Sequence, residues 1–554
     1  MKVCIVSLNS KYIHAAPAPY ALGAGVLAFA KKTHEVLIWE GVVGKGEAPL
    51  LSCLAEIRPD AVAFSVYIWN VESLKTLLPR VREILPHTKI ILGGPEVSYA
   101  VEESFSRMPD SDYILSGEGE VPFAGLLDAL DGGGDPVSVR GCSYPTESGV
   151  FVSEPYVGEG TPPSPLDFGY AEALAGRIAY IEASRGCPFS CAFCLSGRVG
   201  GVRFFDLTRV KRDILRLANA DTRTVKFVDR TFNADRARAR ETIAFILAER
   251  EAGGIPDTVC FHFEIAGELL DEETLALLSR APLGLFQLEI GLQSFSETTL
   301  AAIHRSPVSE RLCENIRRLV AMGNIHVHTD LIAGLPEEDL ASFRAGFDRA
   351  FALGSHMLQL GFLKLLHGAP MREEHGKFPC RYTETAPYTV TETPVLSSSD
   401  LADIALCEEG CERLYNSGRY RQTLAAVLAG GVSPYLLFRD AGEALSALAE
   451  GYTLDDEVAA LARFFEKHLP AARVRDLLLL DFMAVNPSCY TPKSLRREDV
   501  RLAKVKRKID GITPPRAGVR RAYAILYTEE KAAFADYDKK DPVTGRYEVK
   551  IVDL

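Results

Sequence analysis

Three cysteines lie close together in the segment SRGCPFSCAFCLSG of this 554-residue chain, at Cys187, Cys191 and Cys194. Thiolates are soft ligands that suit iron–sulfur clusters and zinc. A four-iron cubane normally takes four cysteines, so a local set of three leaves one iron open to another ligand. A structural zinc site takes four protein ligands, and His262 or another distant residue would have to supply the fourth. The spacing alone therefore leaves both an open iron–sulfur cluster and a zinc site as alternatives.

The cysteines directly follow a strand-like run at residues 179–183. Helical stretches separate this run from five more of the same kind. The six runs cover residues 179–183, 225–228, 260–265, 286–290, 326–332 and 357–362. Strands that alternate with helices predict a parallel sheet, and six such units fit a (β/α)6 partial TIM barrel. Functional groups are then expected at the carboxyl ends of the strands, where the cysteines lie.

The motif Cys187-x3-Cys191-x2-Cys194, with Phe193 before its third cysteine, resembles the signature of the radical S-adenosylmethionine (SAM) family in spacing, order and place. The resemblance implies a 4Fe-4S cluster whose open iron binds S-adenosyl-L-methionine. It also implies an electron donor such as flavodoxin or ferredoxin, and reductive cleavage of SAM to a 5′-deoxyadenosyl radical.

Later strand ends also resemble the SAM-binding segments of this family. The residues that the resemblance assigns to SAM are Phe193, Asp229, Glu264, Gln293, Arg305, Asp330 and Ile332. Asp229 would bind the amino group, Arg305 the methionine carboxylate, and Asp330 the ribose hydroxyls. Taken singly, a strand-end Glu, Gln or Asp is as often a helix cap or a solvent-facing group. Their order behind the cysteine motif favours the SAM site.

The N-terminal region alternates strand-like runs with amphipathic stretches. The five runs cover residues 3–8, 36–39, 61–66, 90–92 and 113–115. This pattern predicts a doubly wound, Rossmann-like parallel sheet of five strands, whose ligands bind at the carboxyl ends of the strands. The candidate ligand-binding residues at those ends are Leu8, Asn9, Ser10, Ser65, Tyr67, Trp69, Gly93, Gly94, Glu96, Gly117 and Glu118.

The segments GGPEVS and ILSGEGEVPF resemble the cobalamin-binding domain that is attached to many radical SAM enzymes. The resemblance implies cobalamin at the strand ends named above. The chain has no Asp-x-His-x-x-Gly motif, so we expect base-off cobalamin without a protein histidine ligand; His14 is the alternative ligand. Trp69 would exclude water from the lower face of the corrin, or else would be core packing.

A cobalamin domain followed by a radical SAM barrel resembles the class B radical SAM methylases. The resemblance implies hydrogen abstraction and methyl transfer from methylcobalamin to an unactivated carbon. The alternatives are a rearrangement, ring-forming or oxidative reaction with the same cofactors, or a non-catalytic cobalamin or iron–sulfur sensor. Abstraction from an sp3 carbon demands no general base, so we name no catalytic acid or base.

The predicted domains are a cobalamin-binding domain at residues 1–135, a hairpin and linker at 136–176, the barrel at 177–375 and a C-terminal accessory or substrate domain at 376–554. The last is predicted to be mainly helical with some terminal strands, and it resembles a domain of one uncharacterised subgroup. Cys407 and Cys411 lie four residues apart and would share a helix face as buried thiols.

The composition is that of an ordinary soluble protein, with 47% hydrophobic and 25% charged residues. The net charge of −12 gives no reason to expect nucleic-acid or membrane binding. No apolar run approaches the roughly 18 residues that span a bilayer, and no signal region is visible, so a cytoplasmic location is expected. The substrate is unknown, and a small metabolite is favoured.

Overall fold

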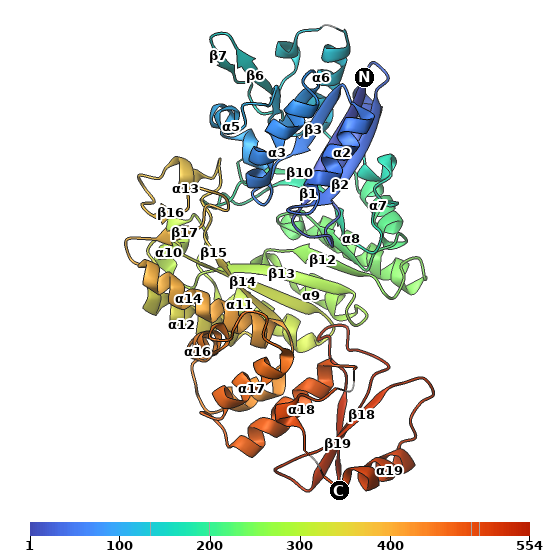
Figure 1. The fold of residues 1–554 in the computed structure, drawn as a ribbon, viewed down its shortest axis with the longest axis vertical. Coiled ribbons are helices and arrows are strands. Elements are labelled where there is room, and N and C mark those ends of the chain that lie inside the picture. Colours follow the sequence, from blue (N-terminus) through green and yellow to red (C-terminus); the bar gives the residue numbers. More distant parts are fainter. Residues whose placement is uncertain (133, 199, 489, 498) are drawn as a thin grey trace. The chain divides into compact units, whose positions relative to one another are not determined.

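A computed structural model describes residues 1–132, 134–198, 200–488, 490–497 and 499–554. Figure 1 shows the helices and strands of the chain. The chain divides into two compact units. The first comprises Met1–Leu278, Ala302–Arg305 and Leu363–Thr393, and the second comprises Ser279–Ala301, Ser306–Phe362 and Pro394–Leu554.

The N-terminal sheet contains the five predicted parallel strands. They are β1 (Lys2–Asn9), β2 (Glu35–Val42), β3 (Ala61–Ser65), β4 (Lys89–Gly93) and β5 (Tyr113–Leu115). Their spatial order is β2-β1-β3-β4-β5, as in a doubly wound sheet. The sheet then continues antiparallel through the predicted hairpin, β6 (Cys142–Thr146) and β7 (Gly149–Phe151). It therefore has seven strands where five were predicted.

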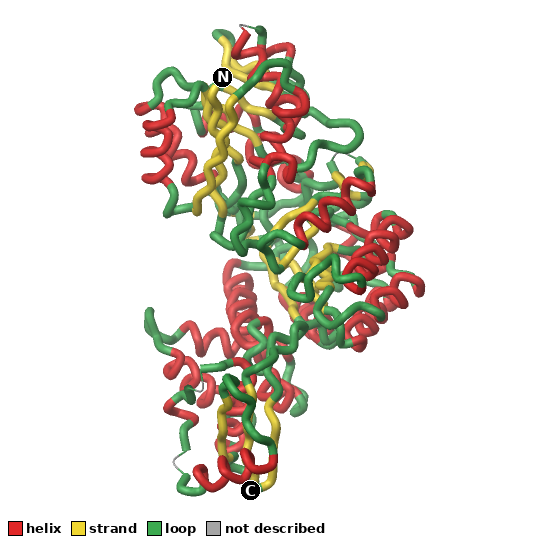
Figure 2. The backbone as a smooth tube through the Cα atoms, turned by 90° about the vertical axis from the view of Figure 1, so that its right-hand side faces the viewer, coloured by secondary structure: helices red, strands yellow, loops and turns green. Residues whose placement is uncertain are grey.

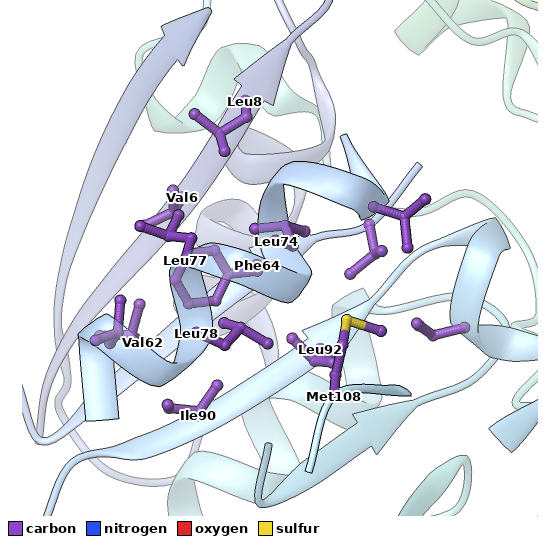
Figure 3. Close-up of a cluster of buried hydrophobic side chains, with 14 of the residues drawn as sticks. Val6, Leu8, Val62, Phe64, Leu74, Leu77, Leu78, Ile90, Leu92 and Met108 are labelled. Carbon is purple, nitrogen blue, oxygen red and sulfur yellow. The ribbon is translucent and has the colours of Figure 1, made fainter. Parts of the chain in front are cut away.

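Helices cover both faces of this sheet (Figure 2). They are α1 (Ala18–Phe29), α2 (Glu47–Ile57), α3 (Val71–Ile84), α4 (Pro95–Ser98), α5 (Val101–Arg107) and α6 (Glu120–Gly132). Alternate side chains of β1, β3 and β4, such as Val6, Phe64 and Leu92, pack with Leu74 and Leu77 of α3 (Figure 3). The opposite side chains pack with α1 and α6. Burial on both faces explains why these strands read as continuous apolar runs.

The six predicted barrel strands are all present. The first unit holds β8 (Ala179–Ile181), β11 (Thr224–Phe227) and β12 (Cys260–Glu264), which pair in parallel. The second unit holds β13 (Phe286–Gln293), β14 (His326–Ala333) and β15 (Met357–Phe362), also parallel. The intervening helices are α7 (Leu207–Ala218), α8 (Arg236–Glu251), α9 (Glu272–Ser279), α10 (Glu297–Ala302), α11 (Glu310–Met322) and α12 (Leu340–Phe351).

The segment after β15 returns to the first unit with α13 (Pro370–Glu373) and a two-stranded ladder, β16 (Arg381–Tyr382) and β17 (Val390–Glu392). No helix in the described residues is long and apolar enough to cross a membrane.

The C-terminal region is mainly helical and ends in a three-stranded antiparallel sheet, as predicted. Its helices are α14 (Ser398–Cys411), α15 (Arg421–Leu428), α16 (Pro434–Ser446), α17 (Leu454–Phe465), α18 (Ala471–Val485) and α19 (Leu502–Ile512). Its strands are β18 (Arg521–Ile525), β19 (Lys531–Asp536) and β20 (Val549–Asp553). Cys407 and Cys411 are buried on α14, as expected of helix-face thiols.

Candidate functional site

The three clustered cysteines lie on a hairpin that the sequence did not predict. Its strands, β9 (Ser184–Cys187) and β10 (Gly201–Phe204), pair antiparallel and bring Cys187 opposite Gly201. Gly186 has φ = 99°, and a Cβ there would lie 2.3 Å from the Gly201 carbonyl oxygen, so only glycine fits. The Cys194 amide donates to the Cys191 carbonyl. The hairpin thus gathers all three cysteines on one closed loop.

Hydrogen-bonding groups surround the three sulfur atoms. Thr231 Oγ1 lies 3.4 Å from Cys187 Sγ, and the Ser196 amide donates to Cys194 Sγ at 3.4 Å. Arg305 Nη1 donates to Cys191 Sγ at 3.7 Å. Burial raises the pKa of Cys191, while the Arg305 guanidinium favours its thiolate. Donors of this kind stabilise metal-bound thiolates and tune iron–sulfur clusters, so the loop fits a cluster.

Asp229 faces inward in the structure. Its carboxylate accepts hydrogen bonds from the Ala183 amide (2.9 Å) and from the Ser184 hydroxyl. Burial raises the pKa of Asp229 to about 7, against these hydrogen bonds. Asp229 therefore braces the chain where it enters the cysteine hairpin, and its contact with the SAM amino group stays a prediction.

Two other predicted SAM residues of the first unit are half-buried. Glu264 ends β12, half-buried, with Arg230 Nη1 3.6 Å from its carboxylate. Phe193 is half-buried beside Cys194. Arg305 faces Cys191, as described above.

Gln293, Asp330 and Ile332 belong to the second unit. Gln293 has φ = 69° at a bulge between β13 and β14, an uncommon conformation for a residue other than glycine. Such outliers cluster at binding sites, which supports the assignment of Gln293. His328 Nε2 lies 3.0 Å from Asp330, and His328 Nδ1 lies 3.8 Å from Glu289. Ile332 is half-buried on the same strand.

Glu338, which follows β14, is a buried acid for which no role was predicted. The Ser294 hydroxyl donates to its Oε1, while its buried Oε2 has no hydrogen-bond partner among the described residues. Burial raises the pKa of Glu338 from 4.5 to about 7. The folded protein therefore holds this proton at a pH where the unfolded chain has lost it.

We expect Glu338→Gln to stabilise the protein above pH 7. In the wild type this group lowers stability as the pH rises from about 4.5 to about 7, because ionisation favours the unfolded chain. At 1.36 kcal/mol per pKa unit the loss is about 3 kcal/mol, which a neutral amide removes. Urea unfolding of both proteins at pH 5 and pH 8 measures it. An equal difference between the two proteins at both pH values would contradict the prediction.

A cavity of about 1460 Å³ occupies the first unit. Nine of the eleven residues predicted for cobalamin line it, namely Asn9, Ser10, Ser65, Tyr67, Trp69, Gly93, Gly94, Gly117 and Glu118. The barrel side contributes residues of β8, β11 and β12 and of the cysteine hairpin, including Arg185 and Glu264. The sequence did not identify residues 154–158 of the linker, which complete the wall. One hint was available: the linker is rich in Gly and Pro and separates two ligand-binding regions.

The cavity extends into an apolar slot between the N-terminal sheet and the helices α1 and α6. Ile5, Ala63, Ile91 and Leu115 form its sheet side, and Leu22 and Phe123 form its helix side. Ala63 is the smallest of these side chains. A flat aromatic base can enter such a slot and bury its faces against apolar groups.

Leu8 and Glu96, unlike the other nine, do not line the cavity, so the cavity does not support these two predicted cobalamin contacts. Leu8 points into the core on the α3 side of the sheet (Figure 3). Glu96 is 4% exposed and accepts hydrogen bonds from Arg107 Nη1 (3.1 Å) and the Tyr388 hydroxyl. Its carboxylate thus belongs to a buried, hydrogen-bonded cluster that connects α4 to the segment after the barrel.

Trp69 is stacked on Tyr67, with ring centroids 4.3 Å apart and an angle of 6° between the ring planes. Its Nε1 donates to the Leu8 carbonyl at 3.1 Å, which fixes the ring. Trp69 is 45% exposed, so the alternative that it is core packing is wrong. The pair presents a rigid aromatic surface to the cavity.

Arg185 forms the centre of a charged cluster on the cavity wall. Its guanidinium contacts Glu118 (2.5 Å), Glu120 (2.6 Å) and Glu182 (2.8 Å). Arg203 also contacts Glu118, at 2.6 Å. Burial opposes ionisation of Glu118, but Arg203 and Arg185 outweigh it and hold its pKa below the usual range. The cluster joins the end of β5 to the hairpin that carries the cysteines.

Comparison with known families agrees with this geometry. Residues 181–349 match the radical SAM superfamily, and residues 22–127 match the B12 binding domain. Residues 376–517 match a family described as a protein of unknown function, DUF4080. One region of the chain is thus similar to the radical SAM superfamily, and the region before it is similar to the B12 binding domain.

Its curated relatives include enzymes of two kinds. It is 29% identical over 314 residues to 2-(S-pantetheinyl)-carbapenam-3-carboxylate methyltransferase of Streptantibioticus cattleyicolor, covering 54% of this chain and 46% of that one. It is 24% identical over 300 residues to the anaerobic magnesium-protoporphyrin IX monomethyl ester cyclase of Cereibacter sphaeroides, covering 51% and 48%. The chain thus spans about half the length of these relatives.

Solved structures show the same fold. The cobalamin-dependent SAM radical enzyme OxsB with aqua-cobalamin bound matches with a TM-score of 0.60 and 16% identity, over 92% of this chain and 81% of that one. TsrM from Kitasatospora setae, with cobalamin and a [4Fe-4S] cluster bound, matches with a TM-score of 0.57 and 20% identity, over 70% and 76%.

Proposed function

We propose that this protein cleaves SAM reductively, abstracts a hydrogen atom from a small metabolite and methylates the resulting carbon. One observation carries the proposal: a single cavity is lined both by the strand ends of the B12-binding sheet and by the barrel strands and cysteine hairpin. When bound, the 4Fe-4S cluster with SAM supplies radical chemistry, and cobalamin supplies the methyl group.

In this proposal, the residues of the chain bind and orient the cofactors, and they exclude water from the site. Cys187, Cys191 and Cys194 would hold the cluster, and Arg305 would stabilise the Cys191 thiolate. Glu264 lies at the cavity wall, where a carboxylate can accept from the amino group of SAM.

We propose that cobalamin binds base-off, with its nucleotide base in the apolar slot. Trp69 and Tyr67 would cover the lower corrin face and keep water from the metal. His14, the alternative ligand, has its Nδ1 2.7 Å from the Tyr180 hydroxyl, and burial lowers its pKa. His14 lines the same cavity, and this hydrogen bond occupies one of its two ring nitrogens. The missing Asp-x-His-x-x-Gly motif is what favours cobalamin without a protein histidine ligand.

We expect Ala63→Leu to abolish retention of cobalamin while leaving the cluster intact. Ala63 is 4% exposed at the floor of the slot, and three added carbons would fill the space that the base needs. Corrin absorbance after desalting, measured beside iron content, tests this. Cys53→Ala, which removes a half-buried thiol away from the cavity lining, is the control. Normal corrin retention in Ala63→Leu would disprove the slot assignment.

The methylation step is tested with SAM whose methyl group is deuterated, so that the methyl group can be followed when it leaves SAM. Reconstituted protein is given a strong chemical reductant, and 5′-deoxyadenosine and S-adenosylhomocysteine are measured. Methylation requires both products, the second only when cobalamin is present. The similarity to the cyclase favours a second candidate, radical ring formation, which would give 5′-deoxyadenosine alone. If the fully loaded protein formed neither of the two products, the result would point to a sensor.

The reaction needs a reductant, and we propose a small flavodoxin or ferredoxin in this role. A reduced ferredoxin that supports SAM cleavage in place of the chemical reductant would bear this out.

A further inference from the structure

The C-terminal region separates charge from the rest of this acidic chain. Residues 493–521 contain 11 Lys and Arg but only 3 Asp and Glu, a net charge of +8. Since the whole chain carries −12, the remaining residues carry −20. Clustered cations in an acidic protein attract polyanions locally, because screening confines the field of the distant acids to about 10 Å at 0.1 M salt.

Helix α19 fixes this charge on a surface. Its apolar side chains Val505 and Ile509 are buried with Ile525 and Phe534 of the C-terminal sheet. Lys504, Arg507 and Lys508 are exposed. They lie three and four residues apart, so they are neighbours on the helix surface. One helical turn, about 5.4 Å, separates Lys504 from Lys508.

These cations are not used in ion pairs within the described part of the chain. The ion pairs around α19 instead use Arg497, Arg501, Arg516 and Arg521. Lys508 Nζ contacts only the Asp553 carbonyl, and Arg507 Nε contacts the Ala503 carbonyl. The arginines in these ion pairs therefore stabilise the fold. The face with Lys504, Arg507 and Lys508 remains accessible to an external anion.

The composition of this face favours phosphate over other acidic partners. Protein interfaces are depleted in lysine and built around apolar anchors, whereas phosphate contacts use Lys and Arg directly. Membrane-surface helices insert a continuous apolar face, but Val505 and Ile509 at the middle of α19 are buried, which leaves only two large apolar side chains exposed, Leu502 and Ile512 near its ends. A row of cations on a rigid helix matches a chain of phosphates.

We infer that the α19 face formed by Lys504, Arg507 and Lys508 binds the phosphate backbone of a nucleic acid. The inference is independent of the cofactors and of the proposed reaction. The net charge of the whole chain, −12, gave no reason to expect nucleic-acid binding, because it averages over the basic segment at residues 493–521.

The test measures binding of the full-length protein to a fluorescent 20-nucleotide single-stranded RNA and to a 20-base-pair DNA duplex by anisotropy. The variant Lys504→Ala/Arg507→Ala/Lys508→Ala should weaken binding to the preferred probe at least about tenfold. It should also reduce the slope of log Kd against log salt by about 2, since each lost contact with a single strand removes about 0.7. The arm that binds more tightly identifies RNA or DNA as the source of the phosphates.

The matched control removes three exposed cations elsewhere in the same unit, Arg463→Ala/Lys467→Ala/Arg473→Ala, and should change affinity less than twofold. Lys504→Arg/Lys508→Arg should retain binding. The inference fails if the wild type binds neither probe at 50 mM salt, or if the two triple variants weaken binding equally. It also fails if phosphatidylserine vesicles or poly-L-glutamate bind this face and nucleic acid does not.

Discussion

We expect Cys194→Ala to leave the anaerobically reconstituted protein with far less iron and no formation of 5′-deoxyadenosine. The wild type is expected to hold about four irons per chain, the content of one cubane. Removing one of three thiolates leaves two, too few to hold the cluster while one iron stays open. Iron and sulfide analysis, with chromatography of the SAM products, measures the loss. We expect iron below about one per chain and product formation at background.

Cys313→Ala is the control because Cys313 is a buried thiol that lies in the second unit, on α11. It should keep full iron content. A wild type that carries one zinc and no iron after the same treatment would contradict the cluster assignment. So would Cys194→Ala protein that still cleaves SAM at the wild-type rate.

The central strands of the N-terminal sheet were predictable because burial on both faces gives them continuous apolar runs. In β13 and β14 buried and half-buried side chains alternate instead, which is also a strand pattern. The two hairpins were harder. The predicted turn near Gly149 is present, but β6 joins the large sheet by pairing with β5, which no local pattern encodes. The pair β9 and β10 contains two glycines and a single β-branched residue, Val202, so it carries little strand propensity.

The site was predictable where backbone position decides it and less so where distant partners do. Ser65, Gly93 and Gly117 line the cavity because they end parallel strands. Glu96 occupies a similar strand end, yet its carboxylate turns to Tyr388, 292 residues further along the chain. A partner that distant leaves no trace in the local sequence.

Arg185→Leu should lower stability by about 3–5 kcal/mol, the cost of breaking a buried ion pair by removing one partner. Burial alone would lower the pKa of Arg185, but the carboxylates of Glu182 and Glu120 hold it well above its usual value. Without the guanidinium, these carboxylates face each other on the cavity wall. Urea unfolding at pH 7.5 measures the effect. Arg216→Leu, which breaks the exposed pair with Asp167, should cost less than about 1 kcal/mol.

The same variant should separate the two halves of the proposed reaction. Arg185 lies two residues before Cys187 and contacts Glu118 and Glu120 after β5, so it ties the loop that we propose for the corrin to the cysteine loop. Arg185→Leu should therefore lose methyl transfer more than SAM cleavage, measured as the ratio of S-adenosylhomocysteine to 5′-deoxyadenosine. Arg185→Lys keeps the charge but loses the forked geometry of the guanidinium. This variant should therefore regain most of the lost stability but less of the product ratio. An unchanged ratio in both variants would leave the cluster around Arg185 with a purely structural role.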